Sequence, residues 1–133
     1  MARTLVCEIV TPDAMLFSGS GVLVSAPASG GEIGMMYLCA PFMSTLKRGI
    51  IRINTEEGET IRFAVNGGYL EVDGYRVVIL ARSAVNVADI DKDASRFLIA
   101  QHEKHLAELA DDDPQAAFAK SQIGWQQYLS SLI

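Results

Sequence analysis

The sequence predicts an α+β protein: an N-terminal antiparallel β-sandwich of about ten short strands followed by a C-terminal antiparallel α-helical hairpin. Residues 1–88 contain every glycine except Gly124, and their side chains alternate between apolar and polar with the period of two that is typical of strands. Residues 89–133 lose that alternation and place apolar residues at helical spacing. We therefore predict two domains, residues 1–88 and residues 89–133.

Length and composition narrow the class of protein. The chain has 133 residues, of which 50% are hydrophobic and 20% charged, which suits a packed core and argues against disorder. No apolar run approaches the roughly 20 residues of a membrane span, so we expect a soluble intracellular protein. A net charge of −5 argues against general binding of nucleic acid. Cys7 and Cys39 are too few for a zinc or disulfide framework and are expected to be free thiols.

Turn residues divide the first domain into short strands. Asp73-Gly74 is the strongest hairpin signal, because a type I′ turn needs positive φ at both central positions. Strands this short cannot bury a face alone, so two sheets must pack together. The clearest predicted strands are residues 4–10, 15–17, 22–24, 50–53, 60–65, 69–72 and 75–80.

Two amphipathic helices are predicted in the second domain. Asp89 is expected to cap the first helix, and Asp113-Pro114 is expected to begin the second, which runs to about Leu132. The short connection between them predicts an antiparallel pair. The apolar stripes are Ile90, Ala94, Phe97, Leu98, Leu106 and Leu109 on the first helix, and Phe118, Trp125, Leu129 and Leu132 on the second.

Catalytic and metal-binding motifs are not found in the sequence. There is no P-loop, dinucleotide fingerprint or nucleophile elbow. His102 and His105 are three residues apart, whereas the zinc-protease helix needs histidines four apart, so we expect a solvated helix face. Cys7 lies in an alternating strand and is expected to pack in the core. These observations favour an interaction module over an enzyme.

The order of short motifs along the chain is more specific than any one of them. The motifs are Phe17-Ser18-Gly19, Gly31-Glu32-Ile33-Gly34, Ala40-Pro41, and the segments at 46–53, 67–72 and 77–81. In this order they resemble the epsilon subunit of bacterial F-type ATP synthases, the type called epsilon in chloroplasts and delta in mitochondria. The resemblance extends over essentially the whole chain.

The resemblance implies a non-catalytic rotor subunit without a cofactor. Such a subunit binds the gamma subunit in the central stalk, rests on the polar loops of the c ring, and couples ring rotation to ATP synthesis. It is peripheral, at the cytoplasmic face of the bacterial cell membrane, and we expect a monomer when it is isolated. The alternative is a free-standing β-sandwich that binds peptide or carbohydrate, which requires an exposed aromatic platform.

The resemblance also assigns residues to three contact surfaces. The expected contact with the c ring comprises Ser29, Gly30, Gly31, Glu32 and Ile33. The expected contact with gamma comprises Ala40, Pro41, Phe42, Met43 and Thr45. The hairpin residues expected to act in regulation, through the alpha and beta subunits, are Lys120, Trp125 and Tyr128.

Two departures from the family pattern change these expectations. Tyr37-Leu38-Cys39 stands where the family often has Pro-Gly-His, and leucine disfavours positive φ, so we expect a different loop path. Ala94 stands where ATP-binding members have arginine, so we expect no ATP site. Lys120 is the only cation of the second helix, and we therefore expect weak inhibition of ATP hydrolysis by the hairpin.

Overall fold

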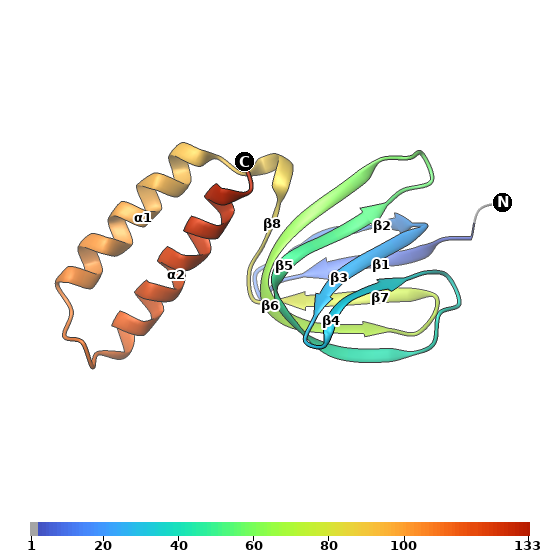
Figure 1. The fold of residues 1–133 in the computed structure, drawn as a ribbon, viewed down its shortest axis with the longest axis horizontal. Coiled ribbons are helices and arrows are strands. Elements are labelled where there is room, and N and C mark those ends of the chain that lie inside the picture. Colours follow the sequence, from blue (N-terminus) through green and yellow to red (C-terminus); the bar gives the residue numbers. More distant parts are fainter. Residues whose placement is uncertain (1–2) are drawn as a thin grey trace. The chain divides into compact units, whose positions relative to one another are not determined.

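The computed structural model describes residues 3–133, which form two compact units (Figure 1). The first unit ends at Asn86 and the second begins at Val87. The first unit contains the strands β1 (Leu5–Val10), β2 (Met15–Gly21), β3 (Leu23–Ala28), β4 (Gly31–Met35), β5 (Phe42–Asn54), β6 (Thr60–Val72), β7 (Arg76–Ala81) and β8 (Ala84–Asn86).

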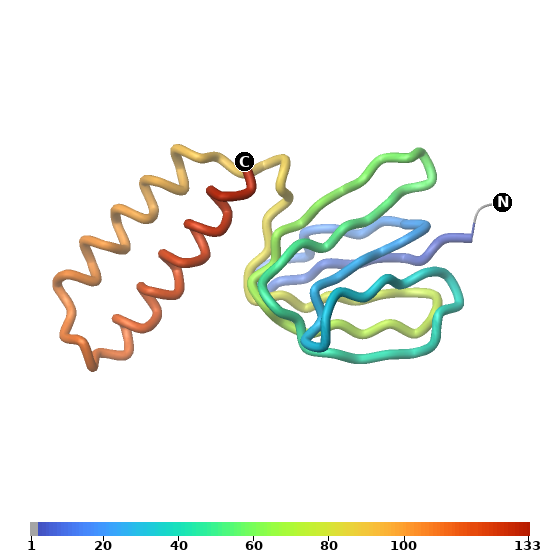
Figure 2. The backbone as a smooth tube through the Cα atoms, viewed as in Figure 1, coloured from blue at the N-terminus to red at the C-terminus, as the bar shows by residue number. Residues whose placement is uncertain are grey.

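The strand number differs from the predicted ten, because two strands are long. β5 and β6 each have 13 residues, and β6 joins the segments 60–65 and 69–72 that were predicted as separate strands. The twelve matched positions between β5 and β6 make the longest pairing of the sheet, which Figure 2 shows as a curved hairpin. Turn residues inside β6 therefore bend the strand without ending it.

The strands follow the order β2-β1-β7-β6-β5-β3-β4, and β8 pairs with β6. Neighbouring strands are antiparallel except for β1 and β7, which pair in parallel from Val6 opposite Arg76 to Val10 opposite Leu80. The predicted antiparallel β-sandwich followed by a helical hairpin is confirmed, except that this one pair of strands is parallel. Parallel strands need a long crossover, and here the five strands between β1 and β7 provide it.

Two glycines produce the bend in β6. Gly67 has φ +76° and Gly68 has φ +139°, which side chains other than glycine rarely adopt. A Cβ atom on Gly68 would lie 2.0 Å from the backbone oxygen of Leu80 in β7. Before the bend β6 pairs with β8, and after it β6 pairs with β7. The bend thus gives the two halves of one strand different neighbours.

Alternate residues of the strands enclose one apolar core. Burial of this surface is the main favourable term in folding. The buried cluster consists of Leu5, Cys7, Ile9, Val24, Ala26, Met35, Leu46, Ile51, Ile53, Phe63, Val65, Leu70, Val72, Val77, Ile79 and Ala81. Cys7 belongs to it, as the alternating pattern predicted.

The turn between β6 and β7 is not the predicted type I′ turn. Gly74 has φ +96°, but among residues 3–133 the only non-glycine with positive φ is Leu38. Asp73 instead accepts hydrogen bonds on Oδ1 from the backbone N–H groups of Tyr75 and Arg76, at 2.9 and 2.8 Å. These bonds hold the pKa of Asp73 below its ordinary value of 3.8. The bonds to the Asp73 carboxylate thus stabilise the turn, which has one residue with positive φ where a type I′ turn has two.

The second unit is a pair of helices, α1 (Lys92–Ala107) and α2 (Pro114–Ser131), preceded by a short 3₁₀ turn at Val87–Asp89. The prediction for α2 is confirmed: Asp113 accepts a bond from the N–H of Gln115 at 2.9 Å, and Pro114 is the first helical residue. For α1 the predicted cap was wrong. Asp91 caps the helix, accepting from Asp93 and Ala94, because the 3₁₀ turn occupies Asp89.

The apolar stripes were predicted only in part. Trp125 and Leu129 of α2 are buried, whereas Phe97 of α1 is 63% exposed and Phe118 of α2 is 64% exposed. The less exposed positions of α1 are Ser95, Ile99, His102 and Leu106, and Leu109 is half-buried just after the helix ends. Their spacing follows the helical period, so a serine and a histidine occupy positions that sequence reasoning gave to phenylalanine and leucine.

Replacing Gly68 with alanine should destabilise the first unit strongly. The new Cβ meets backbone, which cannot rotate away, and the φ value adds strain, so we expect a loss of about 3 kcal/mol or more. Gly30→Ala is the matched control, since nothing lies within 4 Å of its Cβ position. Urea unfolding measures both variants. Equal stabilities would contradict the proposed close approach of β6 and β7.

The two cysteines should differ in reactivity. Cys7 is fully buried, and burial together with the neighbouring Glu8 raises its pKa to about 12, so its thiol stays protonated at pH 8. Cys39 is half-buried. A chromogenic thiol reagent at pH 8 should therefore label one thiol in the native protein and two in denaturant. Native Cys39→Ser should react only slowly, and rapid labelling of that variant would contradict the burial of Cys7.

Candidate functional site

The first predicted contact surface lies at the tip of the β3–β4 hairpin. Ser29 and Gly30 form the turn, and Gly31 begins β4 with φ +129°. A Cβ atom at Gly30 or Gly31 would meet nothing within 4 Å, so the tip is open. Ser29, Gly30, Gly31 and Glu32 are exposed, whereas Ile33 is half-buried and packs against the core. Four of the five predicted residues are thus accessible to a partner.

Arg52 of β5 holds the carboxylate of Glu32. Its Nη1 donates to Glu32 Oε1 at 3.0 Å, and both side chains are about half exposed. Sequence reasoning missed Arg52, which is 20 residues away. Both residues flank β3, where Pro27 pairs with Glu32 and Ser25 pairs with Arg52. Only the register of three strands reveals the pair.

The second predicted surface is split by the alternation of β5. All five of its residues are exposed: Ala40, Pro41, Phe42, Met43 and Thr45. Met43 and Thr45 share one face of β5, opposite Glu71 and Tyr69 of β6. Phe42 points to the other face, since its partner Val72 is buried. Phe42 and Met43 therefore lie on opposite faces of β5, and their contact with gamma stays a prediction.

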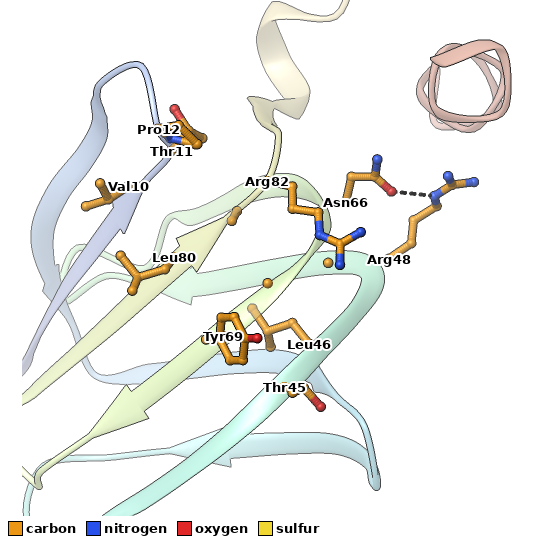
Figure 3. A pocket seen from close by; sticks show the side chains of 13 residues that line it. Val10, Thr11, Pro12, Thr45, Leu46, Arg48, Asn66, Tyr69, Leu80 and Arg82 are labelled. Carbon is orange, nitrogen blue, oxygen red and sulfur yellow. Dashed lines mark hydrogen bonds between the residues drawn. The ribbon is translucent and has the colours of Figure 1, made fainter. Parts of the chain in front are cut away.

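Met43 and Thr45 line a continuous depression on the outer face of β5, β6 and β7. One part, bordered by Met43, Glu71 and Val78, has a volume of about 390 Å³. The other has a volume of about 810 Å³ and is the groove in Figure 3. The two parts share Thr45, Tyr69 and Leu80. Met43 is 74% exposed, Tyr69 64% and Leu80 50%, which makes this an apolar surface without a cover in the first unit.

Sequence reasoning missed most of this groove. Tyr69 pairs with Thr45 on one side and Leu80 on the other, so three strands bring the three residues into one row. Arg48, Asn66 and Arg82 lie at one end of the groove in Figure 3. The alternation of side chains along β6 could have indicated that Tyr69 is exposed. The arginines could be located only after the bend at Gly67 and Gly68 was known.

The loop after β4 contradicts one expectation. Leu38 has φ +63°, so it adopts the left-handed conformation that we expected a leucine to avoid. Two backbone bonds hold it: Leu38 N donates to Gly74 O at 2.6 Å, and Cys39 N donates to Met36 O at 3.0 Å. The leucine side chain is exposed. These two bonds offset the cost of the backbone conformation.

Aromatic side chains border the same loop. Tyr37 and Tyr75 meet edge to face with ring centroids 5.8 Å apart, and the Arg3 guanidinium lies 5.8 Å from the Tyr37 ring. This cluster joins the β4–β5 loop, which contains Tyr37, to the β6–β7 turn, which contains Tyr75. The loop is therefore fixed by packing as well as by backbone bonds.

The predicted hairpin residues differ in accessibility. Lys120 is exposed, whereas Trp125 is only 3% exposed and stacks on Tyr128 with ring centroids 5.9 Å apart. Neither α1 nor α2 is apolar enough over a sufficient length to cross a membrane. Within residues 3–133, no three His, Cys, Asp or Glu side chains are grouped so that they could hold a metal ion.

Comparisons with known proteins find relatives over nearly the whole chain. Residues 4–87 match the family described as "ATP synthase, Delta/Epsilon chain, beta-sandwich domain". The chain is 43% identical over 134 aligned residues to ATP synthase epsilon chain 1 of Methylococcus capsulatus, covering 99% of this chain and 92% of that protein.

Solved structures share the fold. A chain in the Euglena gracilis mitochondrial ATP synthase structure, described as OSCP/F1/c-ring, superposes with a TM-score of 0.71 at 15% identity, covering 97% of this chain and 81% of that one. A chain of the Tetrahymena thermophila mitochondrial ATP synthase, described as central stalk/c-ring, gives a TM-score of 0.54 at 12% identity, covering 95% and 96%. On the sequence matches, the chain belongs to the family of ATP synthase delta/epsilon chains.

Proposed function

We propose that this chain is a non-catalytic rotor subunit in the central stalk of an F-type ATP synthase. The observation that carries the proposal is its similarity over 99% of its length to an ATP synthase epsilon chain. Two structural relatives, one from an OSCP/F1/c-ring assembly and one from a central stalk/c-ring assembly, support the same location. The subunit is peripheral, at the cytoplasmic face of a bacterial membrane. Nothing in the comparisons favours a free-standing peptide- or carbohydrate-binding module.

The proposed contacts lie on two parts of the first unit. The β3–β4 tip meets the polar loops of the c ring, and Met43 and Thr45 meet gamma together with Tyr69 and Leu80. Ser29 connects the two parts, because its N–H and its hydroxyl both donate to Thr45 O at 3.0 Å. The Ser29 and Thr45 hydroxyls also bond each other. A force at the tip thus passes directly into the strand that faces gamma.

The hairpin is proposed to contact the alpha and beta subunits only weakly. Lys120 is available, but the Trp125 indole is buried and would have to be uncovered before it could act as an anchor. The unit also carries a net negative charge, which disfavours an acidic partner.

Membrane extraction tests the function directly. An affinity-tagged chain expressed in its own host and purified from detergent-solubilised membranes should bring down gamma, alpha, beta and c subunits, with one tagged copy per gamma. An untagged strain is the control. Recovery of the chain without ATP synthase subunits would exclude the proposed assembly.

Met43→Asp should weaken binding to purified gamma at least tenfold. A carboxylate placed on the apolar row must be desolvated when gamma covers it, and tenfold corresponds to about 1.4 kcal/mol. Phe42→Asp is the matched control, because the neighbouring side chain points to the opposite face of β5. Isothermal titration calorimetry measures both affinities. A larger loss of affinity for Phe42→Asp than for Met43→Asp would mean that gamma binds the face of β5 opposite to the one proposed.

Glu32→Lys should uncouple rotation from proton transport while gamma affinity stays within about twofold. The substitution reverses the charge at the open tip. Proton pumping driven by ATP in membrane vesicles, followed by a pH-sensitive dye, should fall relative to ATP hydrolysis. Arg52→Gln separates the causes, because it breaks the Glu32 ion pair and keeps the carboxylate. An equal fall in pumping for Arg52→Gln would mean that the ion pair, and not a c-ring contact, is responsible.

A further inference from the structure

Asn66 lies at the bend in β6 and is followed directly by a glycine. An asparagine cyclises when the backbone nitrogen of the next residue attacks its side-chain carbonyl carbon, and a branched side chain on that residue hinders the approach. The chain has three asparagines, and Asn54 and Asn86 are followed by the β-branched residues threonine and valine. The least hindered asparagine of the sequence is therefore Asn66.

The backbone at Gly67 departs from regular strand geometry. β5 and β6 are matched at every position from Phe42 to Asn54 except Lys47, whose partner in this register would be Gly67. Gly67 also has φ +76°, far from the values of a strand. Asn66 and Gly67 are half-buried, and both line the groove in Figure 3, where water reaches them. The attacking nitrogen thus belongs to the residue at which the β5–β6 pairing is interrupted.

Arg48 activates the carbonyl group that is attacked. Its Nε donates to Asn66 Oδ1 at 3.0 Å, which Figure 3 marks with a dashed line. A hydrogen bond from a cationic donor withdraws electrons from the carbonyl carbon. During the attack this oxygen becomes negatively charged, and a donor that is already in place stabilises the charge as it develops. The structure therefore places an activated electrophile next to an unhindered nucleophile.

The segment Asp73-Gly74 has the same spacing but lacks this activation. Cyclisation of an aspartate requires the neutral carboxylic acid, because an ionised carboxylate is a poor electrophile. The N–H groups of Tyr75 and Arg76 bond Asp73 Oδ1 and hold the pKa of this carboxyl below its ordinary value of 3.8. Asp73 is therefore ionised at neutral pH and should stay unmodified.

We propose that Asn66 is a site of spontaneous deamidation in the folded protein. The Gly67 nitrogen loses its proton to hydroxide and forms a bond to Asn66 Cγ, while the bond from Cγ to Nδ2 breaks and that nitrogen takes a proton from water and leaves as ammonia. Water then opens the resulting five-membered imide. Attack of water at Cγ leaves aspartate, and attack at the main-chain carbonyl carbon leaves isoaspartate. No oxidant, reductant or cofactor takes part.

The two products should affect the bend differently. Aspartate places a carboxylate beside the Arg48 guanidinium and leaves the backbone unchanged. Isoaspartate lengthens the main chain of β6 by one carbon atom, although β6 is matched to β5 on both sides of the bend. Because that register is fixed on both sides, the isoaspartate form should unfold at a lower temperature than the aspartate form.

Incubation of the full chain at pH 8 and 37 °C tests the proposal. After digestion at mildly acidic pH, mass spectrometry of the tryptic peptide 63–76 should show aspartate and isoaspartate at position 66, with Asp73 of the same peptide unchanged. Enzymatic methylation of isoaspartate measures the second product. Asn66→Gln should abolish the reaction, because glutamine would have to form a larger ring.

Arg48→Gln tests the activation of the carbonyl. It removes the donor, so the rate of deamidation should fall about tenfold. Lys47→Gln is the matched control, because it removes the same charge from the neighbouring exposed position and should keep the wild-type rate. Thermal unfolding checks that both variants retain the fold. Equal rates in the two variants would overturn the role of Arg48.

Incubation in guanidinium chloride supplies the reference rate of the unfolded chain. If Asn66 stays intact in the native protein over the time in which the unfolded chain is fully converted, the fold protects the site and the proposal is wrong. Isoaspartate forming at Asp73 as fast as at Asn66 would also overturn it, since the structure would then not select the site. Neither result bears on the proposed function, because the reaction needs only this chain and water.

Discussion

The close approach of β7 to the bend in β6 is the constraint on which the first unit depends. Only glycine fits at position 68, where an added Cβ would lie 2.0 Å from Leu80 O. The bend lets one strand pair with β8 on one side and β7 on the other. It also presents Tyr69 beside Leu80 and brings Arg82 next to Gly67. The core and the groove therefore arise from the same two-glycine segment.

Local chemistry made part of the fold predictable. Asp113 and Pro114 satisfy the requirements of a helix start within two residues, so their role is visible in the sequence. Asp73 and Gly74 correctly indicated a turn, but the carboxylate bonds that define its type depend on the path of the chain after it. In β6, glycines that usually end a strand instead bend it, because the pairing with β5 continues through them. Long-range pairing overrides local turn signals there.

The candidate surfaces divide in the same way. The open tip at Gly31 and Glu32 is a local motif, and sequence alone locates it. Arg52 of β5 lies near Glu32 of β4 only because both strands pair with β3, which lies between them in the sheet. Alternation along β5 could have separated Phe42 from Met43, but which face is buried requires knowing that Val72 lies opposite Phe42. Residues that are brought together by strand register cannot be found from local motifs, whereas residues that define a turn can.

Hydrogen bonds and an ion pair join the two candidate surfaces, which lets a force on one of them reach the other. A rotor subunit must transmit force between its partners, and a turn held by glycine backbone alone would fix its own direction poorly. Ser29 compensates, because its backbone and hydroxyl bond the strand that carries Met43 and Thr45. The Glu32–Arg52 pair joins the other side of the same tip to β5. Exposed ion pairs contribute at most about 1 kcal/mol to stability, so the value of this pair lies in fixing the direction of the carboxylate. The tip is thus open to a partner at Gly30 and Gly31 and tied to β5 on both sides.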